Sequence, residues 1–158
     1  MNIKSIYFEN FRGYRESPVF QFSERFTIIS GINGLGKTTL LDGVATAITR
    51  LISGLEYYEG VSNYRKIFKK DFYHDSTNLR IEAKFDCVGI PVTIEVNANK
   101  KGEKITSDKN ELGIGLVEEI RRKYLEDDLG ERPVVVSYAN NRAIYTRVVA
   151  LGFTRVSG

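Results

Sequence analysis

Apolar side chains occupy every second position in two segments of the chain, residues 79–85 and residues 92–96. Charged or polar side chains fill the positions between them. This alternation is typical of strands that have one buried face and one face in water. Gly89 lies between the two segments, so we expect them to form an antiparallel hairpin.

The N-terminal part of the chain is also rich in residues that favour strands. Residues 3–8 contain several aromatic and β-branched side chains, and residues 19–22 form a second short candidate strand. Residues 26–29, which read Phe-Thr-Ile-Ile, form a mostly apolar run that ends at Ser30 and Gly31. Such a run is typical of a short strand that is buried on both faces of a sheet, and we expect one here.

Two later segments carry the period of an amphipathic helix. In the first, one helical face collects Leu40, Leu41, Val44, Ala45, Ile48, Leu51 and Ile52. Gly54 is the residue at which we expect this helix to end. The second helix is expected over residues 111–126, where apolar residues again recur on one side.

The remaining segments are predicted from composition and local signals. Residues 55–78 are polar, aromatic and irregular, and we expect a loop with one short helix. Residues 97–110 are basic and polar, which favours an exposed turn. Residues 134–138 follow Pro133 and form a compact apolar run, which predicts a further strand.

Composition limits the class of protein. A chain of 158 residues with 42% hydrophobic side chains is long enough for one domain with a packed core. The 23 basic and 20 acidic residues give a formal charge of +3, which is too balanced to indicate a nucleic-acid partner by itself. We see no run of apolar residues long enough to span a membrane.

The only cysteine is Cys87, so no internal disulfide can form, and we expect a protein of the reducing cytoplasm. The only histidine is His74, and with a single cysteine it does not suggest a zinc site. The first residues lack the apolar core of a signal peptide, which agrees with a cytoplasmic location.

The strongest chemical signal is "GINGLGKT" at residues 31–38, which matches the phosphate-loop pattern G-x-x-x-x-G-K-[ST] without a gap. Glycines let such a loop turn tightly and approach an anion closely. Its amide N–H groups would then point at the β- and γ-phosphates of a nucleotide. The alternative is a glycine-rich turn with an incidental lysine. The expected strand before the loop and helix after it favour a phosphate site.

This pattern assigns a role to each loop residue. Lys37 is the candidate catalytic residue, because it places a mobile positive charge over the phosphates. The Thr38 hydroxyl is the candidate ligand of Mg²⁺. The candidate nucleotide-binding residues of the loop are Gly31, Asn33, Gly34, Leu35, Gly36, Lys37, Thr38 and Thr39.

The loop "GINGLGKTT" resembles the Walker A motif of ABC-type ATPases related to RecF and SMC proteins. Upstream, "IYFENFRGY" is similar to the N-terminal strand motif of the same proteins. The resemblance implies an α/β P-loop NTPase fold, of which this chain is the ABC-type N-terminal lobe. Such a lobe has a mixed sheet, a helix after the phosphate loop and an antiparallel β-subdomain.

By position, the resemblance places Asn10, Phe11, Arg12 and Gly13 beside the nucleotide. We expect Arg12 to supply a second cationic contact to phosphate and Gly13 to lie in the same nucleotide-binding turn. The other interpretation of Arg12 is a surface arginine that happens to follow a strand.

A third stretch, "RPVVVSYANNRA", is similar to a segment of AAA-family ATPases in bacterial defence and mobile-element systems, including the Septu PtuA group. This match suggests that Asn141 and Arg142 lie at the end of a sheet strand, where ligands of α/β proteins often bind. A plain polar loop is the alternative.

Several parts of a complete ATPase are missing from the sequence. The apolar run at residues 134–136 leads into Ser137 and Tyr138, not into the acidic pair of a Walker B motif. We also find no signature motif and no glutamine after the phosphate loop. Asp71 lies where that glutamine is expected and could contact water or Mg²⁺, although a solvated loop acid is the simpler interpretation.

We therefore expect residues 1–158 to form a single ATP-binding lobe that lacks Walker B and signature motifs. By resemblance, it would hydrolyse Mg²⁺-ATP only when completed by a C-terminal lobe and a second protomer. The parent protein is expected to be a homodimer or higher oligomer. A nuclease or other effector subunit would be a further partner, in an antiphage defence or DNA-maintenance complex.

Two other functions remain open. One is a nucleotide sensor or assembly subunit that binds ATP without cleaving it. The other is a DNA-binding module, because many lysines are interleaved with aromatic residues in two polar segments. These residues are Tyr64, Lys66, Phe68, Lys69, Lys70, Phe72, Tyr73, Lys100, Lys101 and Lys104.

Overall fold

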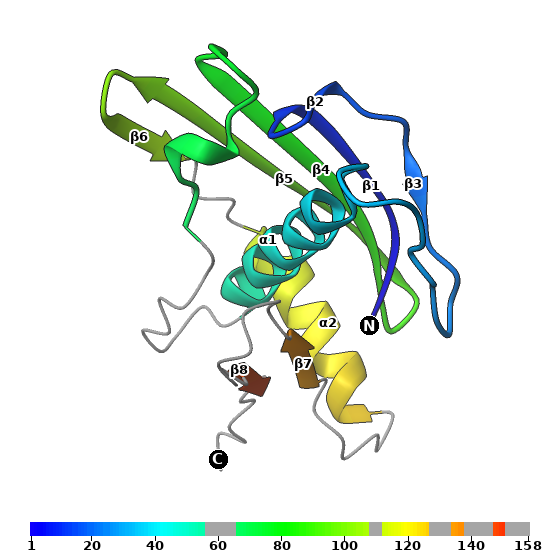
Figure 1. Cartoon of the computed structure of the whole chain (residues 1–158). Coiled ribbons are helices and arrows are strands. Elements are labelled where there is room, and N and C mark those ends of the chain that lie inside the picture. Colours follow the sequence, from blue (N-terminus) through cyan, green and yellow to red (C-terminus); the bar gives the residue numbers. More distant parts are fainter. Residues whose placement is uncertain (56–65, 108–111, 127–133, 138–146, 151–158) are drawn as a thin grey trace.

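Figure 1 shows the computed structural model of the protein, which describes residues 1–55, 66–107, 112–126, 134–137 and 147–150. A sheet of six strands carries helix α1 across one face. The strands of this sheet are β1 (Asn2–Phe11), β2 (Tyr14–Glu16), β3 (Phe20–Gln21), β4 (Asn78–Cys87), β5 (Ile90–Lys101) and β6 (Lys104–Ser107). The other elements are α1 (Lys37–Leu55), the short 3₁₀ helix η1 (Lys69–Asp71), α2 (Ile114–Glu126), β7 (Val134–Ser137) and β8 (Arg147–Ala150).

The strand order is β2-β1-β4-β5-β6, with β3 also pairing with β1, and every described pairing is antiparallel. The expected hairpin is confirmed as β4 and β5, which are longer than the alternating segments. Val88 and Gly89 form its turn with φ angles of 58° and 78°. Two successive positive φ values are the geometry of a tight two-residue hairpin turn.

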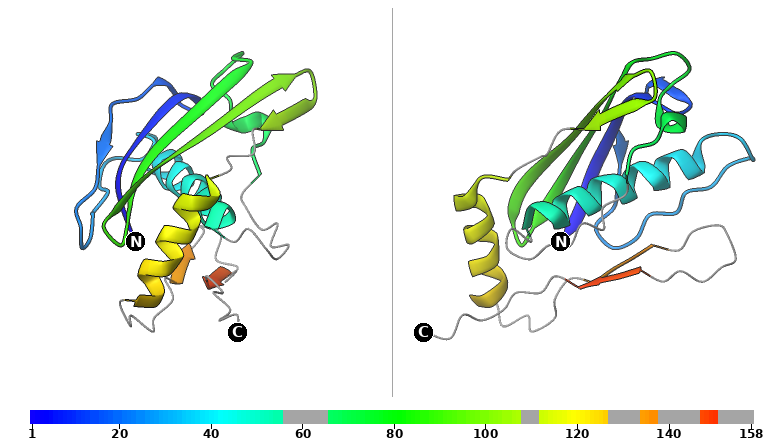
Figure 2. Two further views of the ribbon diagram at one scale, coloured as in Figure 1. Left: turned by 180° about the vertical axis from the view of Figure 1, so that it is seen from behind. Right: turned by 90° about the vertical axis from the view of Figure 1, so that its left-hand side faces the viewer.

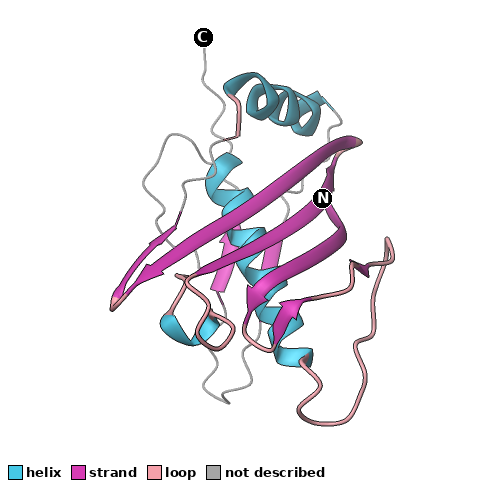
Figure 3. Cartoon of the chain, turned by 90° about the horizontal axis from the view of Figure 1, so that it is seen from above, coloured by secondary structure: helices cyan, strands magenta, loops and turns pink. Residues whose placement is uncertain are grey.

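The core lies between this sheet and α1. Figure 3 shows α1 running obliquely across the strands, on one side of the sheet only. Ile81 and Ile94 from the sheet and Leu51 from the helix are completely buried. The helix and the sheet pack tightly at Gly43, where a Cβ atom would lie 2.2 Å and 2.4 Å from atoms of the Phe8 ring.

The helix expected after the glycines is confirmed, with two differences. It continues through Gly54 to Leu55. Leu41, which the helical pattern placed on the apolar face, is 55% exposed. The opposite face of the sheet is polar, as the alternation predicted. There, Arg80 donates hydrogen bonds to Glu82 at 2.6 Å and to Glu95 at 2.8 Å.

The strand expected at residues 26–29 is not formed. This segment has no regular structure, and Phe26 and Ile28 are 73% and 78% exposed. A strand that is buried on both faces needs a strand on each side and a layer above and below. Among the described residues no strand lies beside this segment, and the pairings of the six-stranded sheet are all antiparallel.

The exposed turn expected over residues 97–110 is confined to Gly102 and Glu103, and residues 108–110 lie outside the described residues. Strand β5 continues to Lys101, and β6 pairs with it through a second tight turn at Gly102, whose φ is 59°. The strand pattern was hidden because both faces of this hairpin end carry polar side chains, so no apolar alternation marks it.

Helix α2 begins at Ile114, three residues later than the expected start at residue 111. Figure 2 shows it beside the C-terminal end of α1. A Cβ atom on Gly54 would lie 3.0 Å from the Leu112 side chain, and Ile120 is completely buried. The strand expected over residues 134–138 is found as β7, and it pairs with β8. Within the described part of the chain, no helix is long and apolar enough to cross a membrane.

Candidate phosphate-binding site

The glycine-rich loop leads directly into α1, because Gly36 precedes Lys37, the first residue of the helix. Gly34 and Gly36 have φ angles of 91° and 82°, which side chains with a Cβ rarely adopt. The Leu40 N–H donates to the Gly36 carbonyl at 2.9 Å, the first hydrogen bond of the helix. The N–H groups before it have no partner within the helix and form the positive end of its dipole.

The Lys37 side chain turns back into the loop. Its Nζ donates hydrogen bonds to the carbonyl oxygens of Gly31 at 2.6 Å and Ile32 at 2.7 Å. The loop therefore curls around its own ammonium group, which adds a positive charge at the helix N-terminus. Thr38 is exposed in the first turn of α1, and Thr39 beside it is partly buried.

Tyr14 supports the loop from the sheet side, which the sequence did not indicate. Its hydroxyl oxygen is 2.8 Å from the position that a Cβ on Gly36 would take. The Tyr14 ring stacks on Phe8 with centroids 5.8 Å apart and meets Phe20 edge-on at 5.8 Å. The signal that could have found it is the aromatic residue directly after the Phe-Arg-Gly turn.

The turn between β1 and β2 is unusual in its backbone. Asn10 and Arg12 have φ angles of 52° and 50°, which cost energy for residues other than glycine. Main-chain hydrogen bonds hold the turn from outside: Tyr73 N–H donates to the Asn10 carbonyl, and Arg12 N–H donates to the Asp71 carbonyl, both at 2.8 Å. A Cβ atom on Gly13 would have no atom within 4 Å other than those of Gly13 and its chain neighbours.

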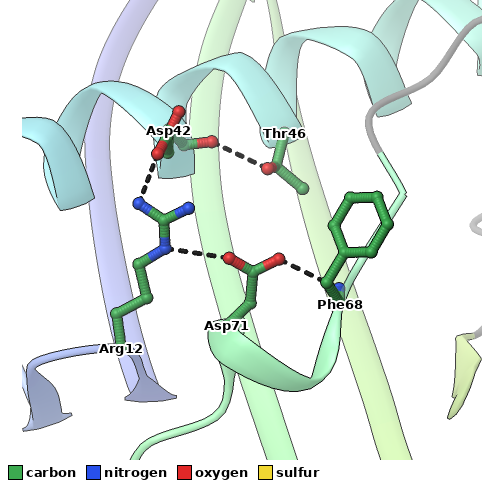
Figure 4. Close-up of polar contacts among 5 residues, drawn as sticks. All are labelled: Arg12, Asp42, Thr46, Phe68 and Asp71. Atoms are coloured by element: carbon green, nitrogen blue, oxygen red, sulfur yellow. Dashed lines mark hydrogen bonds and ion pairs between the residues drawn. The ribbon is translucent and has the colours of Figure 1, made fainter.

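The Arg12 side chain joins three parts of the molecule (Figure 4). Its Nε donates to Asp71 Oδ1 at 2.8 Å, and its Nη1 forms an ion pair with Asp42 on α1. Asp71 is fully buried, and its Oδ2 accepts a hydrogen bond from the Phe68 N–H at 3.0 Å. The simpler interpretation of Asp71 as a solvated loop acid is therefore wrong. The predicted contact of Arg12 with phosphate stays a prediction.

Exposed apolar side chains occur in the loop, in the segment just before it and in the first part of α1, and we call these residues together the loop-side apolar surface. It consists of Phe26, Ile28, Ile32, Leu35 and Leu41, all at least 55% exposed. The predicted nucleotide-binding residue Leu35 thus contributes its side chain to this surface. Asn33 lies in the exposed part of the loop.

A basic surface forms where η1 meets the hairpin of β5 and β6. Lys69 pairs with Glu103 at 2.6 Å, which brings the lysines of the two segments together. Lys70 lies over the Phe68 ring at 5.9 Å, and Phe68 itself is 51% exposed. This basic surface consists of Lys66, Phe68, Lys69, Lys70, Lys100, Lys101 and Lys104. Tyr64, Asn141 and Arg142 lie outside the described residues.

The other groups that could act as nucleophiles or metal ligands do not form a site among the described residues. Cys87 is fully buried, and burial raises the pKa of its thiol to about 11. A thiol with that pKa is protonated at neutral pH and is a poor nucleophile. Within the described residues, no group of three or more His, Cys, Asp or Glu side chains could hold a metal ion.

The sheet, the helix and the glycine-rich loop at its start define the N-terminal lobe of a P-loop NTPase. A family model described as an AAA domain, AAA_23, matches residues 5–152. The chain therefore belongs to this AAA domain family, and membership of a P-loop ATPase family implies ATP binding.

Curated proteins with similar sequences are longer than this chain. It is 32% identical over 105 residues to the DNA replication and repair protein RecF of Protochlamydia amoebophila, covering 66% of this chain and 26% of that protein. It is 29% identical over 137 residues to the DNA double-strand break repair Rad50 ATPase of Methanosarcina acetivorans, covering 80% and 11%. It is 28% identical over 116 residues to the retron Ec83 probable ATPase of Escherichia coli, covering 72% and 21%. The chain thus spans about a third or less of each of these relatives.

Proposed function

We propose that this chain is the ATP-binding lobe of a RecF/SMC-like ATPase and that it binds Mg²⁺-ATP through residues 31–39. The observation that carries the proposal is the loop curled around the Lys37 ammonium at the start of a helix packed on the sheet. That arrangement gathers backbone N–H groups, a helix dipole and a cation at one point, which suits a polyphosphate.

The residues present fit the nucleotide on chemical grounds. Gly34 and Gly36 hold backbone angles that leave the loop without Cβ atoms at two turns. Lys37 supplies the charge that phosphate oxygens prefer, and Thr38 carries a hydroxyl of the kind that coordinates Mg²⁺ in phosphate loops. With its phosphates held there, ATP would supply the phosphoanhydride bond that an ATPase cleaves.

Hydrolysis requires groups that the described residues do not gather. We propose that a C-terminal lobe supplies the Walker B acids and that a second protomer supplies the signature motif. The loop-side apolar surface supports this completion, because its exposed side chains, which lie in and beside the loop along the chain, are available for contact with another lobe. The chain covers only 26% of the RecF protein and 11% of the Rad50 ATPase that it resembles, which agrees with a longer parent protein.

The decisive experiment is calorimetric titration of ATP into the protein, with Mg²⁺ and with EDTA. We expect Lys37→Ala to weaken binding about tenfold to a hundredfold, the size of a charge-assisted contact to phosphate. Lys84→Ala is the matched control, because Lys84 is exposed on the polar face of the sheet. Thr38→Ala should remove most of the difference between Mg²⁺ and EDTA. Equal binding by the Lys37 and Lys84 variants would overturn the proposal.

A non-hydrolysing sensor is the alternative for the same site, favoured by the missing acidic pair. Steady-state release of phosphate distinguishes the two. Turnover by the pure protein that Lys37→Ala abolishes excludes the sensor. Tight ATP binding without turnover, alone or with its partner protein, favours it.

A second candidate function rests on the basic surface. The Lys69–Glu103 pair joins the two lysine-bearing segments, and Lys70 lies over the exposed Phe68 ring, which suits a phosphate backbone and a stacked base. Binding of single-stranded DNA should weaken steeply with salt, and Lys70→Ala with Lys101→Ala should reduce the slope of log K against log salt by about 1.4. No binding at 25 mM salt, about the lowest practical ionic strength, excludes this function for the chain.

The biological setting is proposed from relatives alone. The RecF and Rad50 names concern DNA repair, and the retron ATPase name favours a defence system. We propose that the parent protein dimerises or forms a higher oligomer, and that a nuclease or other effector acts with it in one of these settings. Light scattering with and without Mg²⁺-ATP tests the first point. Recovery of a nuclease with the natively expressed protein tests the second.

A further inference from the structure

Two carboxylates hold the Arg12 guanidinium, and they differ in how firmly they are themselves held. The Asp71 side chain is 0% exposed, whereas the Asp42 side chain is 32% exposed. Figure 4 shows them on opposite sides of the guanidinium, Asp42 on α1 and Asp71 in the 3₁₀ turn.

Asp71 contacts Arg12 through both its side chain and its main chain. Its Oδ1 accepts from Arg12 Nε at 2.8 Å, and its carbonyl oxygen accepts from the Arg12 N–H at 2.8 Å. Its Oδ2 is fixed by the Phe68 N–H at 3.0 Å. Breaking this pair would take a charge-assisted hydrogen bond from a fully buried carboxylate, which is unfavourable. The contact of Arg12 with Asp71 is therefore the firmer of its two contacts.

Asp42 makes the weaker contact. It meets only the Nη1 end of the guanidinium, and water reaches its side chain. An ion pair that is partly exposed contributes little, because water can replace either partner. Asp42 also lies four residues after Thr38 and so on the same face of α1, about one helical turn from the phosphate loop.

We propose that Asp71 is a positioning residue, which holds Arg12 beside α1, and that Asp42 is the exchangeable partner of Arg12. Asp42 neutralises Nη1 while the phosphate loop is empty and releases it to an anion bound at the start of the helix. The strained backbone of Asn10 and Arg12, held by the 71–73 segment, keeps the guanidinium pointing at α1 throughout. This inference rests on the proposed ATP binding.

The test is a set of ATP dissociation constants in the full protein, with melting temperatures measured in parallel. Asp71→Asn should weaken ATP binding about tenfold, because Arg12 loses its anchor. Asp42→Asn should do the opposite and tighten binding about two- to fivefold, because a competing carboxylate is gone. Glu119→Gln, an exposed acid on α2, is the control for net charge and should change nothing.

The same variants are then made in the Arg12→Gln background. If both aspartates act through Arg12, neither substitution changes ATP affinity there, whereas a general electrostatic effect of Asp42 would persist and overturn the inference. Unchanged affinity of Asp42→Asn in the wild-type background also overturns it. If Asp71→Asn fails to fold, the Asp42 pair of measurements decides alone. Failure of the wild type to bind ATP overturns the proposed function as well, whereas wild-type binding that Lys37→Ala removes leaves that function standing.

Discussion

The β4–β5 hairpin and the segment before the phosphate loop are both predicted as strands from their apolar residues, but they reach opposite environments. Ile81 and Ile94 of the hairpin are 0% exposed, whereas Phe26 and Ile28 are 73% and 78% exposed. The hairpin strands have β1 and β6 beside them and α1 across one face. The loop segment has no such neighbours among the described residues. An apolar pattern thus predicts burial only where the same chain supplies the surrounding layers.

The largest effect that separates the two regions is the loss of an aromatic ring. Phe8 is 0% exposed beneath α1, and Phe8→Ala should lower the free energy of unfolding by about 3–5 kcal/mol. Phe26→Ala should change it by no more than about 0.5 kcal/mol, because that ring is already in water. Urea unfolding followed by circular dichroism measures both. Equal losses would show that Phe26 belongs to the core and that the comparison is wrong.

The next effect concerns the tight packing of the helix against the sheet at Gly43. A methyl group on Gly43 would meet the Phe8 ring at 2.2 Å, so Gly43→Ala should cost about 1–3 kcal/mol as the core is forced apart. Gly115 in α2 has nothing within 4 Å, and Gly115→Ala should stabilise by up to about 1 kcal/mol through helix propensity. Melting temperatures should therefore move in opposite directions. A stabilised Gly43→Ala variant would mean that α1 can move off the sheet.

Sequence reasoning predicted the hairpin and the helix after the glycines from their clear local periods, and the strand at residues 134–138 from a compact apolar run after a proline. It failed at residues 26–29, where burial depends on neighbours that a local pattern cannot reveal. It also missed β6, because polar side chains cover both faces of that hairpin end and leave no alternation to detect.

In the site, too, local patterns were predictable from the sequence and contacts between distant residues were not. The spacing of glycines and Lys37 predicted the loop and its helix, because the motif is contiguous. The environment of Arg12 was not predictable, because Asp42 and Asp71 are far from it in sequence and meet it only in the fold. Tyr14 was missed for a related reason: its partner Gly36 has no side chain to suggest a contact.

A smaller effect should appear in binding and not in stability. Gly36 has a φ of 82°, and its missing Cβ leaves room for the Tyr14 hydroxyl at 2.8 Å. Gly36→Ala should weaken ATP binding about tenfold, because the exposed loop relaxes to a different conformation and must regain the original one, at roughly 1–2 kcal/mol, when ATP binds. The melting temperature should change little, because the relaxed loop carries no strain. Adding Tyr14→Phe should restore part of the affinity, because the contact disappears while the conformational cost remains. ATP binding equal to the wild type would show that this glycine is not needed for the loop conformation.

The smallest expected effect is on the stability contributed by an ion pair on the polar face of the sheet. This face is exposed, as the loop segment is, but it has regular strand structure, as the core has. A hydrogen bond from Arg80 lowers the pKa of Glu95 below its usual 4.5. A carboxyl whose pKa is lower in the folded state stabilises the fold above its unfolded pKa, and this contribution disappears as the pH falls through the folded pKa. Glu95→Gln should therefore cost up to about 0.5 kcal/mol at pH 7 and nothing at about pH 3.

Urea unfolding of the wild type and the variant at both pH values measures the difference, with Glu119→Gln as the exposed control. High salt should reduce it, since the pair is accessible to water. A cost that persisted at low pH would show that Glu95 acts through packing and not through its charge.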